Sequence, residues 1–164
     1  MEFKALSVDD IKKSLDSGYQ VEITGFRADE DPEDSFPCVL KKIDLLAWLI
    51  NGKVPNELTA AVEDLFNLSK AKKKTVEEYN DIDQIREGYK LNEWIARESM
   101  VEPKFDDLKD AGVYLSQQQL LDIYVFQMNG VNALKQFRDL NKNAQFNDRI
   151  EAILEEAVGA PGDN

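Results

Sequence analysis

Five carboxylates between Arg27 and Ser35 have the greatest potential for chemistry in this chain. They are Asp29, Glu30, Asp31, Glu33 and Asp34. Clustered carboxylate oxygens can bind hard cations such as Ca²⁺. The stretch lacks the D-x-[DN]-x-[DN]-G frame and the distal glutamate of a calcium hand. Two interpretations remain open: a solvated loop between two strands, or a weak site for a divalent cation.

Nucleophilic chemistry has little support, because the chain contains no histidine and only one cysteine, Cys38. Without histidine there is no Ser–His or Cys–His pair and no imidazole ligand for zinc. Cys38 lies on a predicted strand, where we expect it to be a small buried apolar residue. The eight glycines form no phosphate-binding loop. Carboxylate, lysine or tyrosine chemistry stays open in principle, but we expect no enzyme, no cofactor and no metal.

The charge of the chain bears on its partners. There are 32 acidic and 20 basic residues, which give a formal net charge of -12. Such a charge repels phosphate backbones and anionic membrane surfaces, so we expect neither nucleic acid nor membrane as a partner. The longest apolar run, Leu45 to Ile50, is too short to span a bilayer. With one cysteine and no secretory signal pattern, we expect a cytosolic protein.

The apolar pattern of the N-terminal third predicts a helix, two strands and two further helices. Ser7 can cap a short helix that ends near Leu15, and alternation then predicts a strand. Pro37 places the start of the second strand at an edge. Asp44 can cap the next helix, and Pro55 suits the first turn of the one after it. The predicted ranges are 7–15, 19–26, 36–43, 44–51 and 56–68.

The remaining sequence predicts helices alone. Thr75 has capping-box spacing to Glu78 and opens a long helix to about Met100. A proline-bearing loop with a short turn covers 103–115. Ser116 then caps a helix with almost no polar side, which is typical of a helix at the centre of a core or clamped between partners. Two shorter helices cover 131–140 and about 146–157.

These patterns predict a mainly α protein with a small N-terminal β-hairpin (α+β) and a bundle-like C-terminal half. We expect an N-terminal lobe at 1–68, a basic linker at 69–75, a helical lobe at 76–158 and a disordered tail at 159–164. The basic linker contains Lys70, Lys72, Lys73 and Lys74. It is either plain solvated chain or a contact for nucleic acid or for the acidic regions of another copy.

Three ordered motifs carry a resemblance to a known family. The first is Leu40-Lys41-Lys42, the apolar run 45–50, and the segment GKVPNEL followed by AVEDLF at 61–66. The second is MVEP at 100–103. The third is LSQQQL at 115–120, then IYVF, GVNAL and Phe137-Arg138. In this order they resemble the tail assembly chaperones of long-tailed (siphovirus-type) bacteriophages of Gram-positive bacteria. The acidic stretch 27–35 is longer than the turn typical of that family, and Gln118 stands where an acidic residue is common.

The resemblance implies a function and partners. Such chaperones coat the long, aggregation-prone tape measure protein in the host bacterial cytoplasm and bring tail tube subunits to it. The alternative is a structural tail completion or adaptor protein of the virion. Self-association is also open. An acidic inhibitor of a basic partner is a third, weaker alternative.

A chaperone of this kind needs accessible apolar helix faces on a soluble body. The dense apolar hairpin after the second strand is the strongest candidate in the sequence. We predict that its partner-binding residues are Leu45, Trp48, Leu49, Ile50, Pro55 and Leu58. The same residues would equally suit the internal core of an N-terminal lobe, and the sequence leaves both interpretations open.

Overall fold

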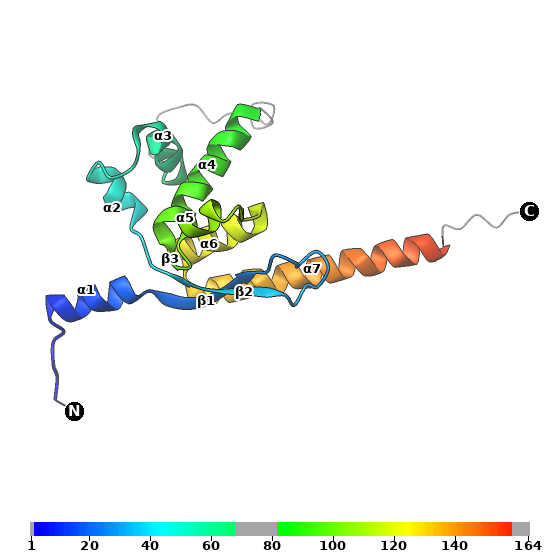
Figure 1. The fold of residues 1–164 in the computed structure, drawn as a ribbon, viewed down its shortest axis with the longest axis horizontal. Coiled ribbons are helices and arrows are strands. Elements are labelled where there is room, and N and C mark those ends of the chain that lie inside the picture. Colours follow the sequence, from blue (N-terminus) through cyan, green and yellow to red (C-terminus); the bar gives the residue numbers. More distant parts are fainter. Residues whose placement is uncertain (1, 68–81, 159–164) are drawn as a thin grey trace, which may run out of the picture.

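The computed structural model describes residues 2–67 and 82–158 (Figure 1). These residues form helices and three strands, which confirms the predicted mainly α fold with a small N-terminal sheet. In chain order the elements are α1 (Val8–Ser17), β1 (Tyr19–Thr24), β2 (Ser35–Leu40), α2 (Leu45–Ile50), α3 (Asn56–Leu65), α4 (Ile82–Ser99), β3 (Met100–Glu102), α5 (Phe105–Asp110), α6 (Gln117–Asn129) and α7 (Val131–Val158).

The predicted N-caps of three helices are confirmed. Ser7 Oγ accepts a hydrogen bond from the Asp10 N–H at 3.1 Å, and Asp44 Oδ1 accepts one from the Ala47 N–H at 3.0 Å. Ser116 begins α6 in the same way. Each cap satisfies a backbone N–H that the first helical turn leaves without a partner. These starts are encoded locally, so the sequence alone locates them.

β1 and β2 form the predicted antiparallel hairpin, with Tyr19 opposite Leu40 and Thr24 opposite Ser35. Alternate residues Val21 and Ile23 are buried, as the period of a strand requires. At the loop end, the Gly25 N–H donates to the Asp34 carbonyl at 3.0 Å. The hairpin therefore has a fixed register and places one face against the helices.

The predicted end of the long helix near Met100 is confirmed, because α4 ends at Ser99, but the strand β3 that follows it was not predicted. β3 pairs antiparallel with β2 and extends the sheet to three strands in the order β1-β2-β3. The Lys41 N–H also donates to the Ser99 carbonyl at 2.8 Å. The pairing joins segments about 60 residues apart, and no local pattern predicts such a contact. The predicted start of the preceding helix at Thr75 lies outside the described residues.

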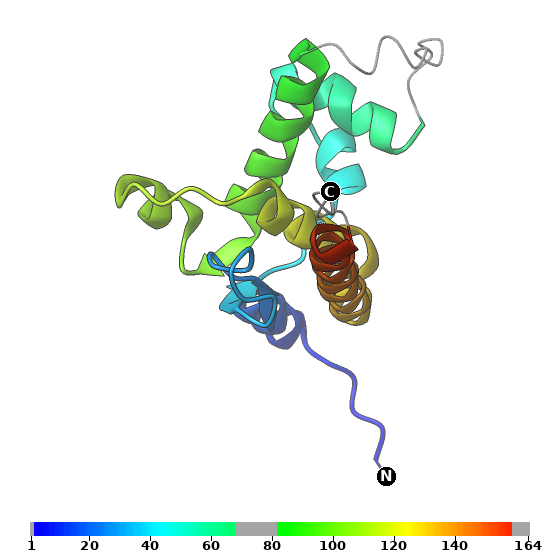
Figure 2. The same cartoon turned by 90° about the vertical axis from the view of Figure 1, so that its right-hand side faces the viewer.

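α6 lies at the centre of the molecule, as its apolar sequence predicted, with α4, α7 and the sheet around it (Figure 2). Ile123 and Phe126 of α6 are fully buried. The core extends from Val21 of the sheet to Leu134 of α7 and includes Val62 of α3. Residues of both predicted lobes therefore share one hydrophobic core. The predicted linker 69–75 and tail 159–164 lie outside the described residues.

Two further segments differ from the sequence prediction. α7 is one helix from Val131 to Val158, where two shorter helices were expected. Residues 105–110 form the short helix α5 within the predicted loop. α7 runs alongside the β1–β2 hairpin and extends beyond it, while α1 projects from the opposite end of the sheet (Figure 1). The molecule is therefore a helical body with two projecting helices.

Candidate partner-binding surfaces

The six residues predicted to bind a partner differ in exposure. Leu45 and Leu58 are buried. Trp48, Leu49 and Pro55 are half-buried, and Ile50 is exposed. Ile50 is 75% exposed, and its neighbour Leu46 is 38% exposed. The surface that α2 offers to a partner therefore consists mainly of Ile50 and Leu46, with the half-buried side chains beside them.

Trp48 connects the α2–α3 hairpin to the helical body. Its ring packs edge to face against Trp94 of α4, with centroids 5.9 Å apart and an interplanar angle of 66°. Lys53 places its Nζ atom 6.0 Å from the centre of the Trp48 ring. Trp48 thus has a structural role, and the part of it that remains exposed borders the apolar surface of α2.

α1 offers a second apolar surface, which was not among the predicted partner-binding residues. None of its residues is buried. Val8, Ile11 and Leu15 recur at helical spacing and are exposed, with Val8 at 80%. Phe3 and Leu6 in the preceding segment are exposed as well. An amphipathic helix whose apolar face is exposed is a surface available for binding.

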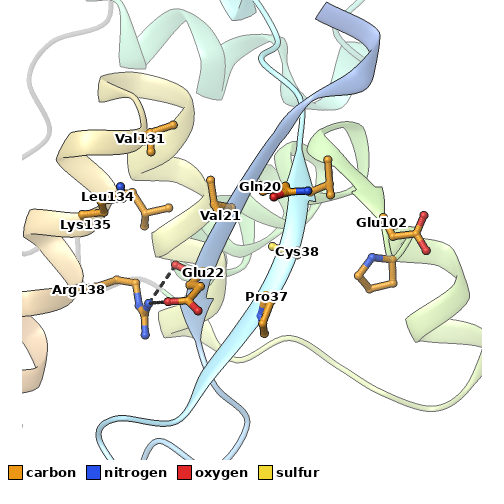
Figure 3. A pocket seen from close by; sticks show the side chains of 12 residues that line it. Gln20, Val21, Glu22, Pro37, Cys38, Glu102, Val131, Leu134, Lys135 and Arg138 are labelled. Atoms are coloured by element: carbon orange, nitrogen blue, oxygen red, sulfur yellow. Dashed lines mark hydrogen bonds and ion pairs between the residues drawn. The ribbon is translucent and has the colours of Figure 1, made fainter. Parts of the chain in front are cut away.

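A groove of about 530 Å³ lies between α7 and the sheet (Figure 3). It runs from the first turns of α7 across β1 and β2 to Glu102 and Pro103 at β3. Its walls are mostly apolar, with charged side chains at the margins. The lining residues used below are Pro37, Val39, Val131, Leu134 and Arg138.

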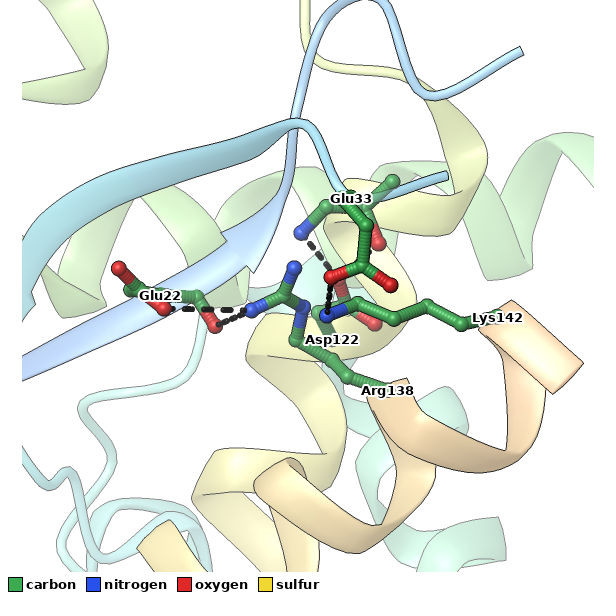
Figure 4. A network of polar contacts seen from close by, with 6 residues as sticks. Glu22, Glu33, Asp122, Arg138 and Lys142 are labelled. Carbon is green, nitrogen blue, oxygen red and sulfur yellow. Dashed lines mark hydrogen bonds and ion pairs between the residues drawn. The ribbon is translucent and has the colours of Figure 1, made fainter. Parts of the chain in front are cut away.

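Arg138 is the most unusual residue of this groove. The side chain is buried, with the residue only 7% exposed. Its Nη1 donates to the Glu22 carbonyl at 3.2 Å and lies 3.8 Å from the Glu22 carboxylate (Figures 3 and 4). Within the described part of the chain, its Nε and Nη2 atoms have no hydrogen-bond partner. A buried guanidinium with free donors is costly, so its position favours an additional anionic ligand.

Buried polar residues of α6 hold the outer edge of β1 (Figure 4). Asp122 is fully buried, and its Oδ2 accepts from the Thr24 N–H at 2.7 Å and from the Thr24 hydroxyl at 2.6 Å. Gln119 donates to the Thr24 carbonyl at 3.0 Å. Together with the bond from Arg138 to Glu22, these side chains satisfy backbone groups that would otherwise face outward unpaired. The edge is thereby closed to strand addition at Thr24.

A second polar cluster fixes the far end of α6. Gln127 accepts from the Ile43 N–H at 3.0 Å and donates to the Lys41 carbonyl and to the Ser99 hydroxyl, both at 2.7 Å. Lys42 donates to the carbonyls of Phe126 and Gln127. Burial lowers the pKa of the Lys42 ammonium. The cluster ties the chain between β2 and α2 to α6, and so sets the position of the hairpin.

Cys38 and the carboxylates of the loop between β1 and β2 are the remaining candidates for chemistry, and their surroundings indicate structural roles. Burial, reinforced by the negative charge of Asp122, raises the pKa of the Cys38 thiol to about 12, so Cys38 is not a nucleophile near neutral pH. In the loop between β1 and β2, Asp34 accepts from the Arg27 N–H at 2.9 Å and Asp31 accepts from the Glu33 N–H at 3.0 Å. These bonds shape the turn, as expected for a hairpin loop.

The described residues contain neither a cluster of metal-ligand side chains nor a helix that could span a membrane. Across 2–67 and 82–158, no three histidine, cysteine, aspartate or glutamate side chains come together as metal ligands would. None of the helices in these ranges is both long and apolar enough to cross a membrane. The lysine cluster at 70–74 lies outside them.

Sequence reasoning missed Gln119, Asp122 and Gln127, although they interrupt an otherwise apolar helix. Polar residues inside such a helix are the signal that could have found them, because a buried polar group requires a partner. Arg138 was noted in a motif but given no role. No protein-family model matches this chain, and neither does any curated protein or solved structure.

Proposed function

We propose that this protein is a tail assembly chaperone of a long-tailed bacteriophage. It binds and solubilises the tape measure protein, helps recruit tail tube subunits, and carries out no catalysis, in the cytoplasm of the host bacterium. The ordered motifs from Leu40 to Arg138 support the family. The observation that carries the mechanism is the exposed apolar side chains, above all Ile50 on α2, on a chain with a net charge of -12.

The binding step requires only apolar contact. A tape measure protein has long helical stripes of apolar residues, which aggregate when they are bare. Ile50 and Leu46 can contact such a stripe, with Trp48, Leu49 and Pro55 beside them. Burying one large aliphatic side chain contributes roughly 1.5–3 kcal/mol. A few such contacts, less the cost of ordering both partners, give an affinity that still permits release.

Leu45 and Leu58 have a different role in this proposal. Both are buried in the core, and with Trp48 they fix the angle between α2 and α3. They therefore position Ile50 without contacting the partner. The strong negative charge keeps chaperone-coated chains apart, because like-charged particles repel over about a Debye length, roughly 8–10 Å at physiological salt.

Mass spectrometry of purified phage particles tests this proposal against the structural alternative. A chaperone leaves before the tail is complete, so we expect this chain in infected-cell lysates and only in traces in finished particles. The tail tube and tape measure proteins serve as internal standards in the same sample. A stoichiometric amount of this chain in finished particles would establish a structural subunit and overturn the proposal.

A further inference from the structure

We propose that α1 of one copy of this chain binds in the groove between α7 and the sheet of a second copy. Two features of the same chain support the pairing. One is an amphipathic helix with no buried residue, and the other is an apolar groove that contains an arginine with two donors unpaired among the described residues. An exposed apolar helix face and a buried guanidinium with unpaired donors are each energetically unfavourable. The groove offers apolar surface to the helix, and the helix offers a carboxylate to Arg138.

The groove belongs to another copy because α1 cannot readily reach its own. Only Gly18 separates the end of α1 from the start of β1. Gly18 has φ +71°, and a Cβ at this position would come within 2.9 Å of the Leu40 carbonyl oxygen. This glycine conformation directs α1 away from the sheet (Figure 1). Docking in the same molecule would require the chain to reverse at this point.

The apolar parts of the two surfaces fit in size. Val8, Ile11 and Leu15 recur at i, i+3 and i+7, the anchor spacing of a helix that lies in a groove. They span about 10 Å along the helix axis. The groove volume of about 530 Å³ is that of a small-molecule site, roughly 300–1,000 Å³, so it is suited to the anchor side chains and not to the whole helix. Pro37, Val39, Val131 and Leu134 supply its apolar walls.

The charges of the two surfaces are also complementary. Asp9 and Asp16 are seven residues apart and therefore lie along one edge of α1. A carboxylate from this edge can bond the guanidinium of Arg138, whose present contact with the Glu22 carboxylate is long at 3.8 Å. Binding therefore adds a second carboxylate for Arg138, whose Nε and Nη2 have no hydrogen-bond partner within the described part of the chain.

The consequence is self-association. A copy whose α1 is bound still has an empty groove, so copies either exchange helices in a closed pair or continue into a larger assembly. The inference does not depend on the proposed function, because it concerns the purified chain alone. A failure to self-associate would leave tape measure binding untested, and failure of tape measure binding would leave self-association intact.

Two complementary variants of the full chain test the proposal in analytical ultracentrifugation. The double substitution Ile11→Asp/Leu15→Asp removes two apolar anchors of α1 and leaves the groove intact. Pro37→Lys disables the groove through an exposed residue, and Val131→Lys provides a second groove variant. Leu140→Asp, at an exposed apolar position of α7 outside the groove, is the matched control. Circular dichroism verifies that each variant is folded.

We expect wild type and the control to associate equally, and each disabled variant to need at least tenfold higher concentration. An equimolar mixture of helix and groove variants should form a 1:1 dimer and nothing larger, since only one intact contact can form. Arg138→Gln should weaken association and reduce its salt dependence. A wild type that stays monomeric up to its solubility limit would overturn the proposal. Disabled variants that associate like wild type, or a mixture that stays monomeric, would also overturn it.

Discussion

The rings of Trp48 and Trp94 meet edge to face, with their centroids 5.9 Å apart. This contact attaches α2 to α4 and leaves Ile50, two residues further along the chain, exposed to solvent. The predicted binding hairpin thus contains both residues that hold the fold and a residue free to contact a partner. Substitutions at the two positions should separate these roles.

Trp48→Ala should destabilise the protein by about 2 kcal/mol, because it removes an aromatic contact from a half-buried site. Ile50→Ser should change the free energy of unfolding by less than about 0.5 kcal/mol, because this side chain is already exposed. Urea denaturation monitored by circular dichroism measures both. Equal destabilisation by the two substitutions would mean that Ile50 belongs to the core, contrary to its position here.

Asp122→Asn should destabilise the protein by about 2 kcal/mol. The Asp122 carboxylate accepts from both the N–H and the hydroxyl of Thr24, and also from Gln118. An amide has one acceptor oxygen and no charge. The two bonds to Thr24 therefore weaken, and the half-buried Gln118 amide loses its acceptor. Asp139→Asn, an exposed substitution on α7, is the matched control and should have little effect. Similar unfolding free energies for the two variants would contradict the network.

The Cys38 thiol should react very slowly with iodoacetamide at pH 8. With a pKa raised to about 12, only about 1 in 10⁴ folded molecules carries the reactive thiolate at that pH. Mass spectrometry should therefore find the folded chain unmodified and the urea-unfolded chain fully alkylated. Rapid labelling of the folded protein would show that Cys38 is exposed.

The same pKa predicts a pH dependence of stability. The folded state holds the Cys38 proton up to about pH 12, whereas the unfolded thiol loses it near 9. The contribution of Cys38 is therefore fully present below about pH 9 and is lost as the pH rises toward 12. Cys38→Ala should show a smaller decline in unfolding free energy than wild type across this window. An identical decline in both proteins would refute the burial of the thiol.

The sequence predicted what local chemistry determines. Ser7, Asp44 and Ser116 begin their helices as expected, and the alternation of β1 marks its buried face. Prediction from the sequence failed where segments far apart in the chain pair with each other. β3 exists only because Met100 lies beside Leu40, and helix propensity alone does not predict that pairing.

α7 gives a second reason for the limits of prediction. It continues through Asn141 and Asn143, which favour helix weakly, because propensity differences are small compared with tertiary packing. Among the predicted binding residues, spacing indicated a common apolar segment but could not separate the buried Leu45 from the exposed Ile50. That distinction depends on where α4 places Trp94. The groove around Arg138 likewise combines residues from β1, β2, β3 and α7.

Co-expression with the tape measure protein tests the central claim most directly. The measured quantity is the fraction of tape measure protein in the supernatant after centrifugation of the lysate. With the wild-type chain this fraction should rise several-fold over expression alone, and Ile50→Ser should reduce the gain while leaving the chaperone folded. If the tape measure protein remains as insoluble with this chain as without it, the proposed function is wrong.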